Sequence, residues 1–208
     1  MKNCWNIGIR MKVVKSLQQD KHLHRRTDNV MYTELKTERL FIRPLCMKDL
    51  ETTYRYQGDK ELTRYMMFLP DESIEATKEF IKGIEEEQQG DSQRRFEFVI
   101  FKEDEHIGGI SVYLENDNNE TVGELGWIIK KEYWGKGYVT EAAKVLMEFS
   151  FHKLGLRKLI AHCDARNKAS ARVMQKIGMT LECEGARQYQ KTGEIAGEYK
   201  YSIVKGQM

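Results

Sequence analysis

Polar and apolar residues alternate with a period of two in three consecutive stretches near the middle of the chain. These stretches are 94–101, 106–114 and 122–129, and the short polar segments 102–105 and 116–119 separate them. Alternation over this length is typical of half-buried strands, and such short connections favour antiparallel neighbours. The pattern therefore predicts an antiparallel meander.

Segments with other periods precede this meander. A shorter alternating run over residues 39–45 predicts a strand at the start of the domain. Two short helices should come next, one that Asp49 caps and that ends near Gly58, and one over residues 61–67. From Ser73 to the glycine at position 90, apolar residues recur every three to four positions, which predicts a longer helix.

The chain after residue 129 alternates between helical and strand patterns. A meander followed by this alternation predicts an α+β fold, with a mixed, mostly antiparallel central sheet flanked by helices. The elements expected here are a helix from about Val139 that closes at Leu154-Gly155, a strand over 156–164, a helix from residue 168 with Gly178 just past its end, and a final strand over 197–204.

Composition narrows the class of protein. With 208 residues, 40% of them hydrophobic, the chain can bury the core of one domain plus an appendage. A net charge of +2 gives no whole-protein field for nucleic acid or membrane binding, and no apolar run approaches the roughly 18 residues of a membrane span. The four cysteines include no C-x-x-C pair and the five histidines no metal-like spacing. We therefore expect a cytoplasmic protein with free thiols and no metal site.

The first 33 residues differ from the rest. Residues 1–30 carry nine charged residues, seven of them basic, without a sustained helical or strand period. We expect 1–33 to form a basic, disordered extension and 34–208 to form the folded domain. The cluster 21–26 is basic, but the folded domain shows no basic stripe, so nucleic acid is not the expected partner.

Two glycines flank a lysine in the sequence KKEYWGKGYVTEA, which runs from Lys130 to Ala142 between the meander and the next helix. A turn with so little side chain lets an anion approach several N–H groups and the helix N-terminus. A Walker loop is excluded because no Gly-Lys pair here precedes Ser or Thr. A dinucleotide loop would need a third glycine where Thr140 stands. A pyrophosphate site and a plain strand-to-helix turn both remain open on this loop alone.

A second motif, NKASARVMQKIGM from Asn167 to Met179, occurs one helix and one strand later. Together the two motifs resemble the GNAT superfamily of acyl-CoA-dependent N-acetyltransferases, over about residues 35–204. The superfamily loop reads Arg/Gln-x-x-Gly-x-Gly/Ala, whereas this chain has Trp134 at the first position and Val139 at the last. That form is similar to the Rim-type (RimJ/RimL-like) ribosomal-protein N-terminal acetyltransferases. The resemblance implies a GNAT-like fold for 34–208 and acetyl-CoA as co-substrate.

The resemblance also implies where acetyl-CoA binds. Backbone N–H groups at the end of the last meander strand can serve the thioester oxyanion and the pantetheine amides, and the glycine loop can hold the pyrophosphate. Asn167 resembles the residue that binds the coenzyme arm, although a helix cap would place it similarly. The predicted coenzyme-binding residues are Trp127, Ile128, Ile129, Trp134, Gly135, Lys136, Gly137, Tyr138, Val139, Thr140 and Asn167.

Two residues are candidates for proton transfer. Many superfamily members protonate the leaving thiolate with a tyrosine, but Met174 stands at that position, and Ser170 resembles the proton donor proposed for the Rim-type branch. Glu124, on the strand that enters the glycine loop, is the candidate base. An ordinary helix-surface serine and an ordinary sheet carboxylate remain the alternatives.

We expect a primary amine as the acceptor, with a protein N-terminus as the first candidate. An α-amine has a pKa of about 7.7–8.0 and a lysine amine about 10.4, so the former needs less help to lose its proton. A polyamine, amino acid or antibiotic stays an alternative, as does a non-catalytic acyl-CoA-binding module. Acceptor specificity is expected in residues 50–90 and near Tyr189. The sequence allows a homodimer but does not determine the oligomeric state.

Overall fold

The computed structural model describes residues 33–68, 70–90, 93–117 and 120–206. The predicted disordered extension therefore lies outside the described residues, except for its last position. No helix in the described ranges is long and apolar enough to cross a membrane.

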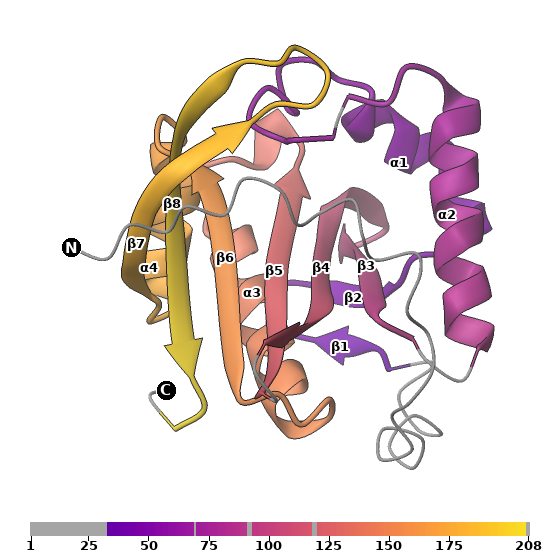
Figure 1. Cartoon of the computed structure of the whole chain (residues 1–208). Coiled ribbons are helices and arrows are strands. Elements are labelled where there is room, and N and C mark those ends of the chain that lie inside the picture. The colour runs from indigo at the N-terminus through magenta and orange to yellow at the C-terminus, as the bar shows by residue number, and fades with distance from the viewer. Residues whose placement is uncertain (1–32, 69, 91–92, 118–119, 207–208) are drawn as a thin grey trace.

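An eight-stranded mixed sheet forms the centre of the molecule, with the strand order β1-β2-β3-β4-β5-β6-β8-β7 (Figure 1). Every neighbouring pair is antiparallel except β5 and β6, which are parallel. This confirms the predicted mixed, mostly antiparallel sheet, and the predicted meander is β3–β5. The strands are β1 (Leu35–Lys36), β2 (Phe41–Pro44), β3 (Arg95–Lys102), β4 (Glu105–Asp117), β5 (Glu120–Ile129), β6 (Lys158–Asp164), β7 (Thr180–Gln188) and β8 (Ile195–Val204).

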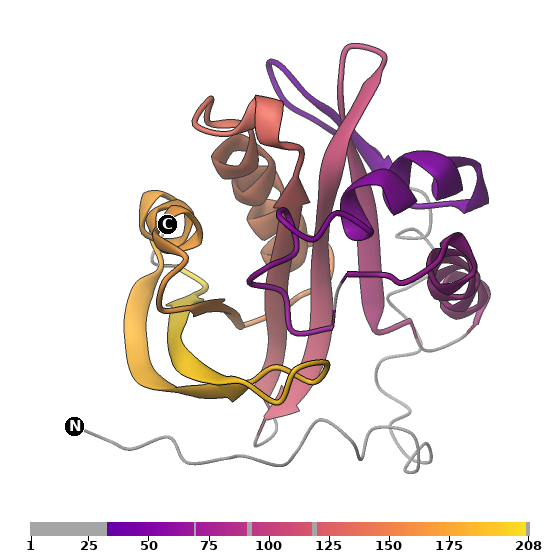
Figure 2. The ribbon, with the colours of Figure 1, turned by 90° about the horizontal axis from the view of Figure 1, so that it is seen from above.

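Four α-helices cover the two faces of this sheet. They are α1 (Leu50–Gln57), α2 (Ile74–Gln89), α3 (Tyr138–His152) and α4 (Lys168–Lys176). Short 3₁₀ helices at Met47–Asp49 and Lys131–Tyr133 precede α1 and α3. Figure 2 shows α3 and α4 on one face of the sheet and α1 and α2 on the other.

The main core lies between the sheet and the helices α3 and α4. Ala142, Leu146 and Phe149 of α3 are buried, and Phe149 packs edge-on against Phe96 and Phe98 of β3, with ring centroids 6.2 and 5.6 Å apart. A smaller cluster of Leu45, Ile81 and Val99 lies under α2 on the opposite face. β3 carries apolar side chains on both of its faces because it lies between these two clusters.

Three local predictions need correction, and two of them concern α1 and the segment after it. Residues 61–67 form no helix: 60–65 is a turn, in which the Asp59 side chain accepts the N–H groups of Glu61 and Leu62. A segment this short cannot sustain a helix on its own. Its Tyr65 carbonyl accepts a hydrogen bond from the Arg187 side chain. Asp49 does precede α1, yet its carboxylate binds the Arg43 guanidinium at 2.6 and 2.8 Å and makes no cap bond to that helix.

The third correction is an additional strand. β7 carries almost only exposed residues and lies at the edge of the sheet, paired with β8 alone. Because an edge strand exposed on both faces needs no alternation of polar and apolar residues, the sequence pattern did not reveal it.

Candidate active site

The parallel strands β5 and β6 separate partway along their length. Their pairing is limited to Val122 with Lys158, Gly123 with Leu159 and Glu124 with Ile160. Figure 1 shows the two strands side by side near their starts and apart near their ends. Within the described residues, β5 beyond Glu124 therefore pairs only with β4, and its other edge over residues 125–129 has no strand partner. These backbone groups can bind the amide groups of an extended ligand.

Close packing holds the strands together just before they separate. A Cβ atom at Gly123 would lie 2.5 Å from Cδ1 of Leu156 and 2.8 Å from Cγ2 of Val112. Only glycine fits between these side chains, since neither neighbour can move far inside the core. Gly123 therefore allows close packing in the last paired part of β5 and β6.

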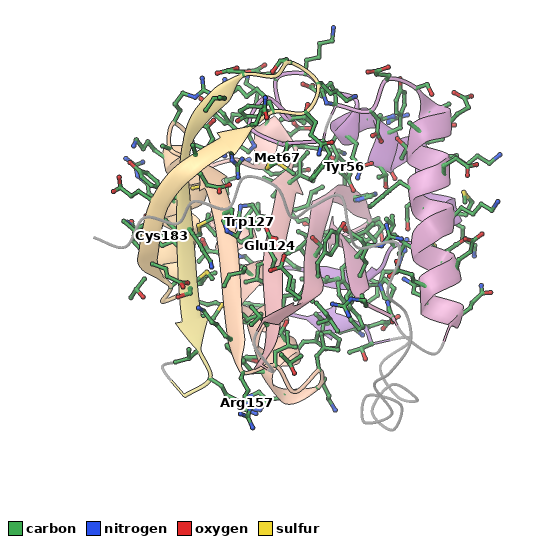
Figure 3. The ribbon with its side chains drawn as sticks, viewed as in Figure 1. Tyr56, Met67, Glu124, Trp127, Arg157 and Cys183 are labelled. Atoms are coloured by element: carbon green, nitrogen blue, oxygen red, sulfur yellow. The ribbon has the colours of Figure 1, made fainter. Side chains whose placement is uncertain are left out.

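Glu124 lies at the start of this opening. Its neighbour Leu125 packs in the core that contains α3, so the alternation of the strand directs Glu124 to the opposite face, toward α1 and α2. Figure 3 shows Glu124 and Trp127 along the central strand β5. Trp127 packs against the core with its neighbours, so its side chain supports the strand while its backbone lines the opening.

His162 is a site residue that the sequence did not single out. Its Nδ1 atom lies 3.0 Å from Oε1 of Glu124, and the two side chains are only 20% and 17% exposed. When Nδ1–H donates to the carboxylate, the neutral ring keeps Nε2 as an acceptor. The alternating pattern of β6 places His162 on the same face as Ile160. That pattern does not reveal that β5, which carries Glu124, is the parallel neighbour of β6.

A second carboxylate lies on the same face of the sheet. Tyr113 of β4 is directly opposite Glu124 of β5, and its hydroxyl donates to Glu97 of β3. Burial raises the pKa of Glu97 to about 7 and raises that of Tyr113 as well. Polar groups on four adjacent strands, Glu97, Tyr113, Glu124 and His162, thus lie on one face of the sheet.

The glycine loop has the conformation that an anion site needs. Gly135 and Gly137 have φ angles of 72° and 83°, and Gly137 is the N-cap of α3. The six consecutive N–H groups from Gly135 to Thr140 have no acceptor among the described residues. They lie at the positive end of the α3 dipole, so they can hold a pyrophosphate. The helix begins at Tyr138, one residue before the predicted start.

Trp134 occupies the position at which the superfamily loop has Arg or Gln. Its indole Nε1–H donates to the Ile129 carbonyl at 2.9 Å, and the residue is 42% exposed. The ring thereby joins the loop to the last residue of β5. Trp134 holds the loop in place through an uncharged hydrogen bond. An arginine at this position would add a positive charge.

A cavity of about 380 Å³ adjoins the loop between α3 and α4. Neither of its two lysines forms an ion pair within the described part of the chain, so their charges are available to a phosphorylated ligand. The lining residues are Glu38, Gly137, Thr140, Glu141, Lys144 and Lys176.

Asn167 and Ser170 lie at the start of α4, just after β6. The Asn167 side-chain oxygen accepts the N–H of Ser170 at 3.1 Å, so Asn167 caps the helix and its NH₂ group stays available. The Ser170 hydroxyl has no hydrogen-bond partner among the described residues, and the residue is half-buried. Met174 is buried in the core and cannot donate a proton. Ser170 and Glu124 thus lie on opposite faces of the sheet.

Two distant segments meet on the Glu124 face. The β7–β8 hairpin arches toward the segment after α1 (Figure 1), and Arg187 donates to the Tyr65 carbonyl at 3.1 Å. Lys191 donates to the Pro70 carbonyl and lies 3.2 Å from the Glu72 carboxylate. The structure therefore brings together the two segments in which acceptor specificity was expected.

The model of the acetyltransferase (GNAT) domain family matches residues 39–180. The chain belongs to the GNAT family of acetyltransferases. It is 33% identical over 171 residues to the N-acetyltransferase YnaD of Bacillus subtilis, across 82% of this chain and 96% of that one. It is 29% identical over 163 residues to the spermidine N(1)-acetyltransferase of Escherichia coli K12, across 78% of this chain and 82% of that one.

Solved structures share the fold of this GNAT protein. A GNAT-family acetyltransferase from Bacillus anthracis superposes with a TM-score of 0.69 at 29% identity, covering 83% of this chain and 98% of that one. RimL, a ribosomal L7/L12 α-N-protein acetyltransferase in complex with coenzyme A, superposes with a TM-score of 0.72 at 18% identity, covering 83% and 98%. The chain is thus an N-acetyltransferase with a GNAT fold, and acetyl-CoA is the acetyl donor of its family. Across the described residues, no group of three or more His, Cys, Asp or Glu is placed to hold a metal ion.

Proposed function

We propose that this acetyltransferase binds acetyl-CoA in the opening between β5 and β6 and transfers the acetyl group to a primary amine on the Glu124 face. The observation that carries this proposal is the end of β5–β6 pairing at Glu124, where the Glu124–His162 pair adjoins an unpaired strand edge. The free N–H groups at residues 135–140 and the cavity beside them supply a place for the pyrophosphate and nucleotide.

The residues around the opening can perform each step of acetyl transfer. Glu124 accepts the proton that the amine loses as its nitrogen attacks the thioester carbon, and His162 holds the carboxylate in place. Backbone N–H groups on the open edge at residues 127–129 stabilise the oxyanion. When the carbon–sulfur bond breaks, the Ser170 hydroxyl or a water bound to it donates a proton to the thiolate. The protons balance, because the amine loses one and the thiolate gains one.

Glu124 and Ser170 approach the opening from opposite faces. The amine can therefore enter on the side of α1 and α2, while the thiolate leaves on the side of α4.

A protein N-terminal α-amine is the acceptor we propose first. Its low pKa, about 7.7–8.0, suits a site with one carboxylate–imidazole pair at the opening, since a useful fraction is neutral at pH 7. The loop form shared with Rim-type enzymes and the fold shared with RimL support it. A polyamine is the second candidate, supported by the identity to the spermidine N(1)-acetyltransferase and by the carboxylates Glu97 and Glu124 on one face.

The test is coenzyme A release with acetyl-CoA and a panel of acceptors. The panel contains peptides with different free N-termini, the same peptides with blocked N-termini and a lysine, spermidine, and free amino acids. A kcat/KM at least tenfold higher for peptides with free N-termini than for the blocked peptides supports the first proposal. A kcat/KM higher for spermidine than for any peptide supports the second. Binding of acetyl-CoA without turnover of any acceptor would leave only the non-catalytic acyl-CoA-binding module.

The cytoplasm is the compartment we propose for this reaction. The described cysteines Cys46 and Cys163 are free thiols. Free thiols persist where the medium is reducing. The partners we propose are coenzyme A and the amine acceptor, and neither nucleic acid nor a membrane. Size-exclusion chromatography with light scattering tests for a homodimer.

A further inference from the structure

Arg39, in the turn between β1 and β2, reaches the glycine loop from nearly a hundred residues earlier in the sequence. Its Nη1 atom donates to the Lys136 carbonyl at 3.2 Å. Its Nε and Nη2 atoms lie 2.7 and 2.6 Å from Oε2 of Glu141, in the first turn of α3. Its guanidinium also lies over the Tyr138 ring, with Cζ 4.6 Å from the centroid. One side chain therefore contacts three successive parts of the loop and helix.

The rest of this turn binds the same carboxylate. The Thr37 hydroxyl and the Arg39 N–H donate to Oε1 of Glu141, and the Leu40 N–H donates to the Thr37 hydroxyl. Burial raises the pKa of Glu141, but the hydrogen bonds from Thr37 and Arg39 outweigh this effect and bring the pKa below its ordinary value. The carboxylate is therefore ionised at neutral pH. Its charge lies one turn from the N–H groups that would receive a pyrophosphate.

An ionised carboxylate at this position opposes the binding of another anion. In the first turn of a helix it interacts with the same dipole and repels the pyrophosphate. Arg39 neutralises that charge with a fork of two N–H groups and uses a third to bind the Lys136 carbonyl of the loop. A lysine presents its three N–H groups from one nitrogen and lacks the planar fork of separate donors that Arg39 uses here.

We propose that Arg39 is a positioning residue for acetyl-CoA, which ties the β1–β2 turn to Lys136 and Glu141 and so keeps the glycine loop ready to bind the pyrophosphate. This inference rests on the proposed function, because it concerns the same coenzyme site. It adds a residue that neither of the two motifs contains.

The experiment compares Arg39→Gln and Arg39→Lys with the parent protein on two acetyl donors. Acetyl-CoA carries the pyrophosphate, whereas S-acetyl-pantetheine lacks it and cannot use the loop. For Arg39→Gln we expect the calorimetric Kd for acetyl-CoA to rise on the order of tenfold or more, about 1.4 kcal/mol per decade. The kcat at saturating acetyl-CoA and the kcat/KM for S-acetyl-pantetheine should remain at parental values. Arg39→Lys should fall between the two.

Arg95→Gln is the matched control. Arg95 makes the same kinds of bond, from Nε to the Glu87 carboxylate at 2.7 Å and from Nη2 to the Gly83 carbonyl at 3.2 Å, but on α2, away from the loop. Its replacement should lower the melting temperature and leave acetyl-CoA affinity unchanged.

The outcomes separate this inference from the function on which it rests. A parent protein that binds no acetyl-CoA would refute the proposed function itself. If the parent binds and Arg39→Gln binds equally well, or loses activity equally with both donors, Arg39 has only a structural role and the inference fails. If Arg39→Gln does not fold, Arg39→Lys provides the same comparison.

Discussion

Replacing Gly137 with alanine is the most direct test of the glycine loop. Gly137 has a φ of 83°, a conformation that residues with a Cβ atom rarely adopt. The added Cβ would meet only Nη2 of Arg39, at 3.6 Å, which is an ordinary contact. The cost is therefore conformational and not steric, roughly 1–2 kcal/mol for a left-handed residue other than glycine.

This cost must appear in one of two measurable quantities. If the loop keeps its conformation, the free energy of unfolding falls by about 1–2 kcal/mol, and the melting temperature falls by about 2–4 °C per kcal/mol for a protein of this size. If the loop relaxes to a negative φ, its N–H groups turn away and the Kd for acetyl-CoA rises roughly five- to thirtyfold. We expect mainly the second result, because residues 134–137 are exposed and can change conformation without disturbing the core. Gly137→Val should be worse, since β-branched residues tolerate positive φ least.

Calorimetric titration with acetyl-CoA and thermal unfolding should be measured on the same samples. Gly206→Ala is the control, because Gly206 also has a positive φ, 99°, with nothing near its missing Cβ, and it lies far along the chain from the loop. That variant should lose stability alone. A Gly137→Ala protein with parental affinity and parental melting temperature would refute the assignment of this loop.

The remaining predictions concern proton transfer and the indole anchor. Glu124→Gln should reduce turnover most at low pH, where less of the amine is already neutral, and should leave acetyl-CoA affinity nearly unchanged; a pH–rate profile with the preferred acceptor shows this. Ser170→Ala should reduce kcat on the order of ten- to a hundredfold at every pH if one bond to the thiolate is lost, at about 1.4 kcal/mol per decade. Parental rates for both variants would mean that these residues are structural. Trp134→Phe removes the bond from Nε1 to the Ile129 carbonyl, so acetyl-CoA affinity should fall by about 0.5–1.5 kcal/mol in calorimetry; no change would mean that the bond does not support the loop.

Much of the fold was predictable from local patterns. The meander β3–β5, the long helix α2, and the order of α3, β6, α4 and β8 arise from hydrophobic periods of two and 3.6, which depend only on which face of an element is buried. The exceptions reflect position in the fold. β7 shows no period because it is exposed, and the segment after α1 forms a turn whose Tyr65 carbonyl accepts a hydrogen bond from Arg187 of that distant strand.

The site was predictable only in part. The two motifs identified the glycine loop, Asn167 and Ser170, and the two glycines with positive φ are local requirements that the sequence displays directly. His162, the Glu97–Tyr113 pair and Arg39 were missed, since each acts through a residue on another element. Their type and spacing in the sequence carry no signal of these partners.

The sequence by itself determined most of the elements, the positive-φ glycines of the loop and the family, because periodicity, glycine conformation and short motifs are properties of neighbouring residues. Only the tertiary structure decided which strands became neighbours, where β5 and β6 part, and hence which charges meet. The Glu124–His162 pair spans 38 positions and the Arg39–Glu141 pair spans 102. Such pairs depend on strand order and register, which are set by how the whole core packs, and a shift of one residue in register would turn each side chain to the other face.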